Sequence, residues 1–188
     1  MSIQHLTDTD YCVMPWANGL GQTVEMIRQE DSDGKLLFRL SMATVTEDGP
    51  FSLFPDIERN LTVLSGDGFD LVEDDSGVQH HAGLLTPVAF AGDVAVTAKN
   101  VTATCHDFNV MTSRGLARPI VSVVHKASAL TIMQAQQLVL FALATSTVRT
   151  PQGNFTLKSY ELLLSQQPVD LLEGSLIAVV IDNDSIGS

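Results

Sequence analysis

"LLFRLSMATV", residues 36–45, is the stretch whose pattern decides the fold class. Its residues alternate in character, so Phe38 and Leu40 share one face of an extended chain while Arg39 and Ser41 share the other. Alternation with period two is typical of a β-strand that buries one face. The stretch therefore predicts a strand whose second face is polar. Such a face is either wet outer surface or the lining of a barrel lumen, and local pattern leaves both alternatives open.

The β pattern continues on both sides of this strand. "NLTVLSGDGFDLVEDDSGVQHH", residues 60–81, predicts a strand, a Gly-Asp-Gly turn, a second strand and an acidic hairpin tip before His80. Residues 129–145 fit a helix as well as two strands, and we expect strands there. Closely spaced strands with few helical windows predict an all-β fold, an antiparallel sandwich or barrel.

The composition limits the classes of partner. The chain has 188 residues, of which 45% are hydrophobic and 17% charged, as in a globular protein. Acidic residues outnumber basic ones 22 to 10, and the net charge of -12 repels phosphate backbones and anionic membranes. We therefore expect neither nucleic acid nor a membrane as partner. With no signal-like start and no long apolar run, the sequence predicts a cytoplasmic protein with Cys12 and Cys105 reduced.

"PWANGLGQT", residues 15–23, contains a Gly-x-Gly step that invites comparison with a phosphate-binding loop. It lacks the Gly-Lys-Ser/Thr of a P-loop and the third glycine of a dinucleotide-binding fingerprint. Local sequence favours an ordinary hairpin with a tight turn at Asn18 and Gly19, and the lip of a pocket is the alternative.

The sequence shows little sign of a metal centre or a catalytic nucleophile. His80 and His81 are adjacent, and neighbours on a strand point to opposite faces, so we interpret them as exposed loop histidines. The same alternation separates Cys105 from His106 and argues against a Cys-His-Asp arrangement with Asp107. We therefore expect no metal, no cofactor and no catalytic residue.

Four stretches occur in order between residues 14 and 115: "MPWANGLGQTVEM", "FRLSMATVTEDGPFSLFPDIERNLTVLSGDG", "FAGD" and "DFNVMTSRG". Together they resemble the HutD/Ves family, cupin-like proteins associated with bacterial histidine utilisation. The resemblance implies a cupin-like double β-sandwich or barrel, an RmlC-like jelly roll. It also implies two lobes within a single unit over residues 1–188, with a lobe junction near 114–119, and a homodimer.

The resemblance also selects the candidate site. It favours the lip of a pocket for the stretch around Trp16, with Trp16 as a rigid apolar wall. Arg39 and Arg59 become anchors for a small anionic metabolite, since a guanidinium grips a carboxylate with two hydrogen bonds. For Arg59 an ion pair with Asp56 or Glu58 is an equal alternative. The expected ligand-binding residues are Trp16, Asn18, Arg39, Ser41, Arg59, Asp107 and Asn109, with Asp107 orienting an arginine and Ser41 and Asn109 as neutral hydrogen-bonding groups.

Three functions follow as hypotheses. The first is a metal-free, non-catalytic or regulatory small-molecule-binding protein linked to histidine catabolism, whose ligand is a small carboxylic acid such as formylglutamate or formate. The second is a metal-free cupin enzyme, an isomerase or hydrolase that acts on a polar metabolite with a carboxylate or histidine as base. The third is a stress-response protein without a small ligand. Fold alone does not choose among them, because cupins host many unrelated activities.

Overall fold

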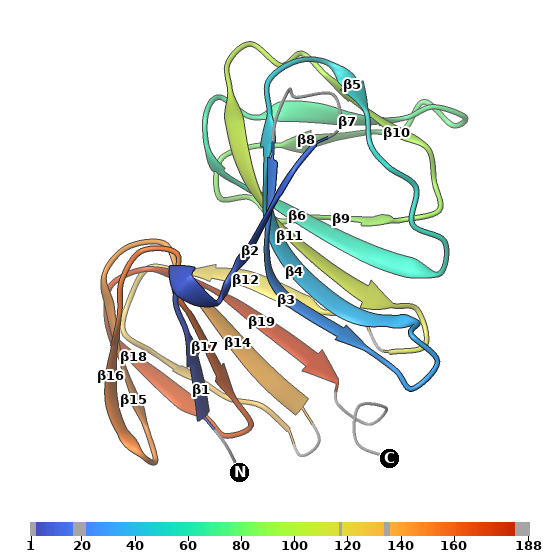
Figure 1. Ribbon diagram of the computed structural model, residues 1–188. Helices are drawn as coiled ribbons and strands as arrows, with labels where there is room; N and C mark the ends of the chain where they lie inside the picture. The colour runs from blue at the N-terminus through green and yellow to red at the C-terminus, as the bar shows by residue number, and fades with distance from the viewer. Residues whose placement is uncertain (1–2, 17–21, 117, 134–135, 183–188) are drawn as a thin grey trace. The chain divides into compact units, whose positions relative to one another are not determined.

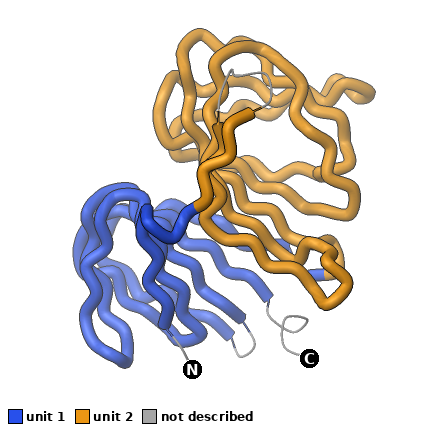
Figure 2. The backbone as a smooth tube through the Cα atoms, viewed as in Figure 1, with its two compact units in different colours: residues 1–11, 116–188 blue, residues 12–115 orange. Residues whose placement is uncertain are grey.

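The computed structural model describes residues 3–16, 22–116, 118–133 and 136–182. Within these residues the only helical element is the 3-10 turn η1 (Asp8–Asp10), so the expected all-β fold is confirmed (Figure 1). The described part of the chain holds no helix that is long and apolar enough to cross a membrane. The chain divides into two compact units: unit 2 comprises residues 12–115, and unit 1 comprises residues 1–11 together with 116–188 (Figure 2).

Unit 2 contains two antiparallel sheets. The six-stranded sheet has the order β2-β3-β4-β11-β6-β9, and the four-stranded sheet has the order β5-β10-β7-β8. Buried apolar side chains from both sheets, among them Leu61 and Phe69, form one core. The strands are β2 (Cys12–Pro15), β3 (Gln22–Glu30), β4 (Leu36–Val45), β5 (Gly49–Pro50), β6 (Ile57–Ser65), β7 (Phe69–Glu73), β8 (Gln79–Ala82), β9 (Val88–Ala91), β10 (Val96–Lys99) and β11 (Cys105–Ser113).

The expected Gly-Asp-Gly turn is confirmed, and it carries the chain from one sheet of unit 2 to the other. Gly66 and Gly68 have φ values of +99° and +83°, a region that side chains with a Cβ rarely adopt. A Cβ on Gly66 would lie 2.6 Å from the carbonyl oxygen of Thr104 and 2.7 Å from Sγ of Cys105. Glycine is therefore required here both by conformation and by space.

The acidic run after β7 forms the tip of the β7–β8 hairpin, as the sequence predicts. The expectation that His80 and His81 lie in a loop is wrong, because both belong to β8, which pairs in register with β7. His81 makes a 2.8 Å hydrogen bond to Asp70 through Nδ1 and remains exposed. The two histidines project to opposite faces of a strand, as alternation requires.

Unit 1 also contains two antiparallel sheets, in the orders β1-β17-β14-β19-β12 and β13-β18-β15-β16. The ambiguous stretch 129–145 forms strands, as expected, although residues 134–135 lie outside the described residues. The strands are β1 (Ile3–Leu6), β12 (Ile120–Val124), β13 (Ser128–Leu130), β14 (Gln136–Ala142), β15 (Ser146–Thr150), β16 (Gly153–Leu157), β17 (Leu162–Ser165), β18 (Val169–Glu173) and β19 (Leu176–Asp182).

The interiors of the two units differ in character. Unit 1 is filled by aliphatic side chains such as Leu138, Leu140 and Leu163, which are fully buried. In unit 2 the inward faces of β6 and β11 carry Leu61 and Cys105 in the apolar core, but further along the same faces they carry charged and amide groups. The interior of unit 2 therefore contains charged and amide side chains with which a polar ligand could form hydrogen bonds.

Candidate functional site

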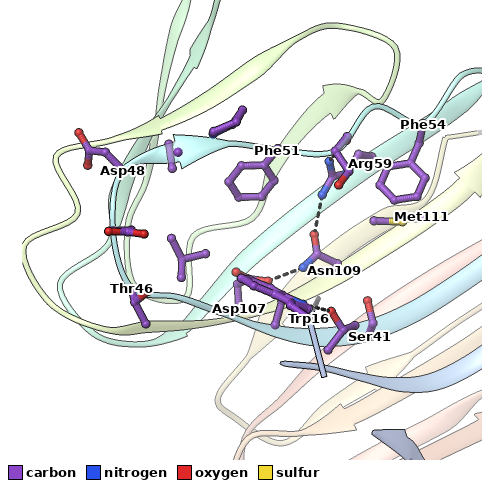
Figure 3. A pocket seen from close by; sticks show the side chains of 18 of the residues that line it. Trp16, Ser41, Thr46, Asp48, Phe51, Phe54, Arg59, Asp107, Asn109 and Met111 are labelled. Atoms are coloured by element: carbon purple, nitrogen blue, oxygen red, sulfur yellow. Dashed lines mark hydrogen bonds between the residues drawn. The ribbon is translucent and has the colours of Figure 1, made fainter. Parts of the chain in front are cut away.

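Three neighbouring strands of unit 2 present polar side chains to a cavity of about 620 Å³ (Figure 3). Arg39 and Ser41 come from β4, Asp107 and Asn109 from β11, and Arg59 from β6. The polar face of β4 is thus the lining of a cavity and not solvent-exposed outer surface. All the described residues that line the cavity belong to unit 2.

The register of the sheet explains why these residues meet. On β11, Met111 lies opposite Arg39 of β4 on one side and opposite Arg59 of β6 on the other. One step along the same face, Asn109 lies opposite Ser41. Because residues two apart on a strand share a face, pairing of these strands brings side chains from distant parts of the chain to one surface.

Arg59 is buried, with 5% of its surface exposed. Its guanidinium lies over three aromatic rings, 5.3 Å from the centroids of Phe51 and Phe54 and 4.8 Å from that of Phe90. Such contacts are favourable for a cation because the face of an aromatic ring carries partial negative charge. Burial lowers the pKa of Arg59 to about 10, so the group is still a cation at neutral pH.

The hydrogen bonds of Arg59 use only part of its donor capacity. Nη1 donates to the carbonyl oxygen of Ser52 at 3.3 Å, and Nη2 donates to Oδ1 of Asn109 at 3.2 Å. Nε is buried and has no partner among the described residues. A guanidinium has five N–H groups, so three of them have no acceptor among the described residues.

The alternative that Arg59 is held by Asp56 or Glu58 is wrong. Glu58 is its neighbour on β6 and points to the other face, where Arg114 donates to it at 2.9 Å. Asp56 lies 3.9 Å from Nζ of Lys35. Within the described residues Arg59 forms no ion pair, although it is a buried charge. The carboxyl group of Asp107 reaches Arg59 only through Asn109, so the guanidinium is suited to direct contact with an anion that enters the cavity.

Asn109 connects Arg59 to Asp107. Its Nδ2 donates to Oδ1 of Asp107, while its Oδ1 accepts the hydrogen bond from Arg59. Asp107 is completely buried, and its second oxygen, Oδ2, has no partner among the described residues. Burial raises the pKa of Asp107 to about 7, although the charge of Arg59 and the hydrogen bond from Asn109 act in the opposite direction. Asp107 thus reaches an arginine through an intervening amide.

Arg39 already has an anionic partner, which the sequence analysis missed. Its Nε donates to Oε2 of Glu25 at 2.5 Å, and Nη1 of Arg28 lies 3.8 Å from the same oxygen. Both side chains of the Arg39–Glu25 pair are largely buried. The available signal was the alternation of β3, which places Glu25 beside Ser41 in the register with β4. Arg39 therefore has a direct carboxylate partner, whereas Arg59 has none among the described residues.

Trp16 lines the cavity just after β2, and its Nε1 donates to Oγ1 of Thr23 at 2.9 Å. Asn18 lies outside the described residues, as do Ala17 and the rest of the connection to β3. Two exposed acidic residues that the sequence pattern did not predict at the site, Glu47 and Asp48, also line the cavity. In Figure 3, Asp48 lies at the opposite end of the cavity from Arg59. The cavity thus has a cationic end and an acidic end.

The geometry also bears on metal binding and nucleophilic catalysis. Among the described residues no group of three or more His, Cys, Asp or Glu side chains is placed to hold a metal ion. The expected separation of Cys105 from its neighbour is confirmed: Cys105 is buried, whereas His106 is exposed and makes a 3.0 Å hydrogen bond to Ser65. What the cavity offers is hydrogen-bond donors for an anion and one buried carboxyl group.

Known proteins resemble the chain over most of its length. The family model described as HutD matches residues 8–177. A Pseudomonas putida relative, an uncharacterized 21.2 kDa protein in the hutC 3′ region, is 40% identical over 113 residues, which is 58% of this chain and 57% of the relative. The structure of HutD from Pseudomonas fluorescens SBW25, in a formate condition, is 26% identical, with a TM-score of 0.85 and coverage of 98% of this chain and 100% of that chain. A conserved protein of unknown function from Pseudomonas aeruginosa PAO1 is 25% identical, with a TM-score of 0.83 and coverage of 97% and 98%.

Proposed function

The chain belongs to the HutD family and has its cupin-like fold, and from this premise we propose that it is a non-catalytic, regulatory protein that binds a small carboxylic acid in the cavity of unit 2. The link to histidine utilisation comes from the family and from the relative in the hutC 3′ region. Formylglutamate and formate are the ligands we propose. The formate condition of the Pseudomonas fluorescens structure makes formate the simplest probe.

The observation that carries the proposal is the state of Arg59. It is a buried cation that lines a cavity and lacks a direct ion-pair partner among the described residues. Three of its N–H groups have no acceptor among these residues. A carboxylate would place a negative charge in direct contact with the guanidinium and accept two of these N–H groups. The three rings around the guanidinium hold it in place, so little rotamer freedom remains to be lost on binding.

The test compares conservative substitutions of the cavity arginines. Formate and formylglutamate should raise the melting temperature of the parent in a concentration-dependent way, because a ligand that binds only the folded state stabilises it by mass action. Arg59→Lys keeps the positive charge but loses the planar fork, and it should weaken binding by about 2 kcal/mol. Arg39→Lys should weaken binding less, since Arg39 is already paired with Glu25.

Arg149→Lys is the matched control, because Arg149 is an exposed arginine of unit 1 paired with Asp170. It should bind both acids like the parent. If Arg59→Lys retains the circular dichroism spectrum of the parent and binds the acids equally well, the carboxylate-binding proposal is wrong. The same holds if the parent responds to neither acid.

A metal-free enzyme is a second candidate function, and the observation that favours it is Asp107. A carboxyl group whose pKa is raised to about 7 in a cavity is suited to general-base chemistry. Under this hypothesis Asp107→Asn would abolish turnover of a polar metabolite while the ligand still binds. Assays of the parent with the intermediates of histidine degradation separate an enzyme from a binder: measurable turnover that Asp107→Asn removes would favour the enzyme.

A further inference from the structure

Each of the two cavity arginines is linked to a carboxyl group before any ligand enters. Arg39 is neutralised by Glu25, at 2.5 Å. Arg59 is linked through the amide of Asn109 to Asp107, which is the completely buried carboxyl group of the site. With Asp107 ionised, this second pair also has no net charge.

A carboxylate bound to Arg59 would upset this balance. The site would then hold two negative groups, the ligand and Asp107, around the one guanidinium of Arg59. In a buried site of low dielectric, two like charges this close do not both remain ionised, and a proton is taken up instead. The proton goes to the carboxyl group whose charged form is least hydrated.

We propose that the cavity binds a carboxylate together with one proton, and that Asp107 holds this proton. The inference rests on the proposed function, since it presupposes an anionic ligand at Arg59. Binding breaks no bond of the ligand: the acid enters as its anion, and one proton passes from solvent to Oδ2 of Asp107. The affinity of the protein for the acid then depends on the pH of the medium.

The geometry of Asp107 fits this role. Oδ1 is already committed as the acceptor of Asn109, whereas Oδ2 has no partner among the described residues and is free to carry the proton. Protonation at Oδ2 leaves the hydrogen bond at Oδ1 intact. The amide of Asn109 therefore keeps its orientation, with Oδ1 toward Arg59, and the anion-binding group is not displaced when Asp107 becomes neutral.

The other charged groups around Asp107 are less suited to take the proton. On β4, Arg39 donates a direct hydrogen bond to Glu25 of β3, so this acidic side chain already has a cationic partner. On β6, Arg59 is the only charged residue among those described to line the cavity. Glu47 and Asp48 are exposed, so water can hydrate their charges. No histidine is among the described lining residues. Burial favours Asp107, whose pKa it raises to about 7 even without a ligand.

Isothermal titration calorimetry of the full chain with sodium formate and with formylglutamate tests the proposal. Each titration is run at about pH 6 and about pH 8.5, in buffers of different ionisation enthalpy, so that the number of protons taken up can be read from the buffer dependence of the heat. At pH 8.5 Asp107 is ionised before binding, and we expect an uptake close to one proton. Above pH 7 the affinity should fall about tenfold for each pH unit.

Asp107→Asn is the informative variant, because an amide at this position can still accept from Asn109 and has a donor where the proton would sit. It should bind formate with an affinity that hardly depends on pH and without proton uptake. Asp48→Asn removes an exposed carboxyl group at the other end of the cavity and should leave proton uptake unchanged.

The outcomes separate this inference from the proposed function. Binding by the parent at pH 8.5 without proton uptake overturns the role of Asp107 but leaves carboxylate binding in place. Proton uptake that persists in a folded Asp107→Asn protein overturns it as well. Failure of the parent to bind either acid at both pH values overturns the carboxylate-binding function and this inference with it. The measurement on the parent decides the matter even if Asp107→Asn does not fold.

Discussion

Arg59 of β6 donates one of its hydrogen bonds diagonally, to Asn109 of β11, at 3.2 Å. Its direct partner in the register is Met111, two residues further along β11. The diagonal contact directs the guanidinium toward the end of the face where Asp107 lies, and the amide of Asn109 is held by both charged groups at once. The position of the cation in the cavity therefore depends on a carboxyl group that it does not touch.

The buried carboxyl group predicts a specific pH dependence of stability. Burial raises the pKa of Asp107 from 3.8 to about 7 in the folded protein, so the folded state holds a proton that the unfolded state releases. The stabilisation is fully present below about pH 4 and is lost as the pH rises through 7. Between these values the free energy of unfolding of the parent should fall by about 1.4 kcal/mol per pH unit relative to Asp107→Asn.

Urea denaturation of both proteins at a series of pH values measures this difference. Asp75→Asn serves as the control, because Asp75 lies exposed at the tip of the β7–β8 hairpin. Its profile should run parallel to that of the parent. Parallel profiles for the parent and Asp107→Asn would show that Asp107 ionises without cost in the folded state.

The sheet-changing turn predicts an unequal response to two glycine substitutions. Gly77→Ala places a Cβ in open space at a φ of +69° and should cost about 1 kcal/mol from backbone strain. Gly66→Ala adds contacts of 2.6 Å and 2.7 Å with Thr104 and Cys105, so it should cost at least about 2 kcal/mol more. Thermal and urea unfolding of the two variants provide the comparison, and equal losses would contradict a packing role for Gly66.

We also expect the purified protein to carry no stoichiometric transition metal. The segment before "LTVLSGDG" has Phe54, Pro55, Asp56 and Arg59 but no histidine, and imidazole is a common ligand of such metals. Elemental analysis of protein purified without chelators checks this expectation. One metal ion per chain, whose removal lowers both the melting temperature and formate binding, would prove it wrong.

Alternation in the sequence predicted which side chains share a face of a strand, but not their interactions. It correctly placed Arg39 and Ser41 on one face of β4, and the resemblance to a cupin-like family favoured a pocket beside Trp16. It did not reveal that Glu25 neutralises Arg39, because an ion pair between neighbouring strands depends on their register. Register is a property of the assembled sheet and cannot be predicted from the sequence of either strand alone.

The aromatic cage of Arg59 was missed for a related reason. Phe51 and Phe54 come from the segment between β5 and β6, and Phe90 comes from β9. Local patterns show that each phenylalanine is apolar but not that all three surround one cation. Asn18, the homodimer and the identity of the ligand stay predictions.

The pairing of β1 with β17 has a consequence for the order in which parts of the chain can fold. Ile3 lies opposite Ser165, and β17 is the only strand of the described residues that pairs with β1. During synthesis the whole of residues 12–115 leaves the ribosome before β17 exists. Unit 2 is thus able to fold before β17, the strand that pairs with β1, has been synthesised. The first strand of the chain is among the last to be placed, and closing so long a loop makes this step an entropic barrier late in folding.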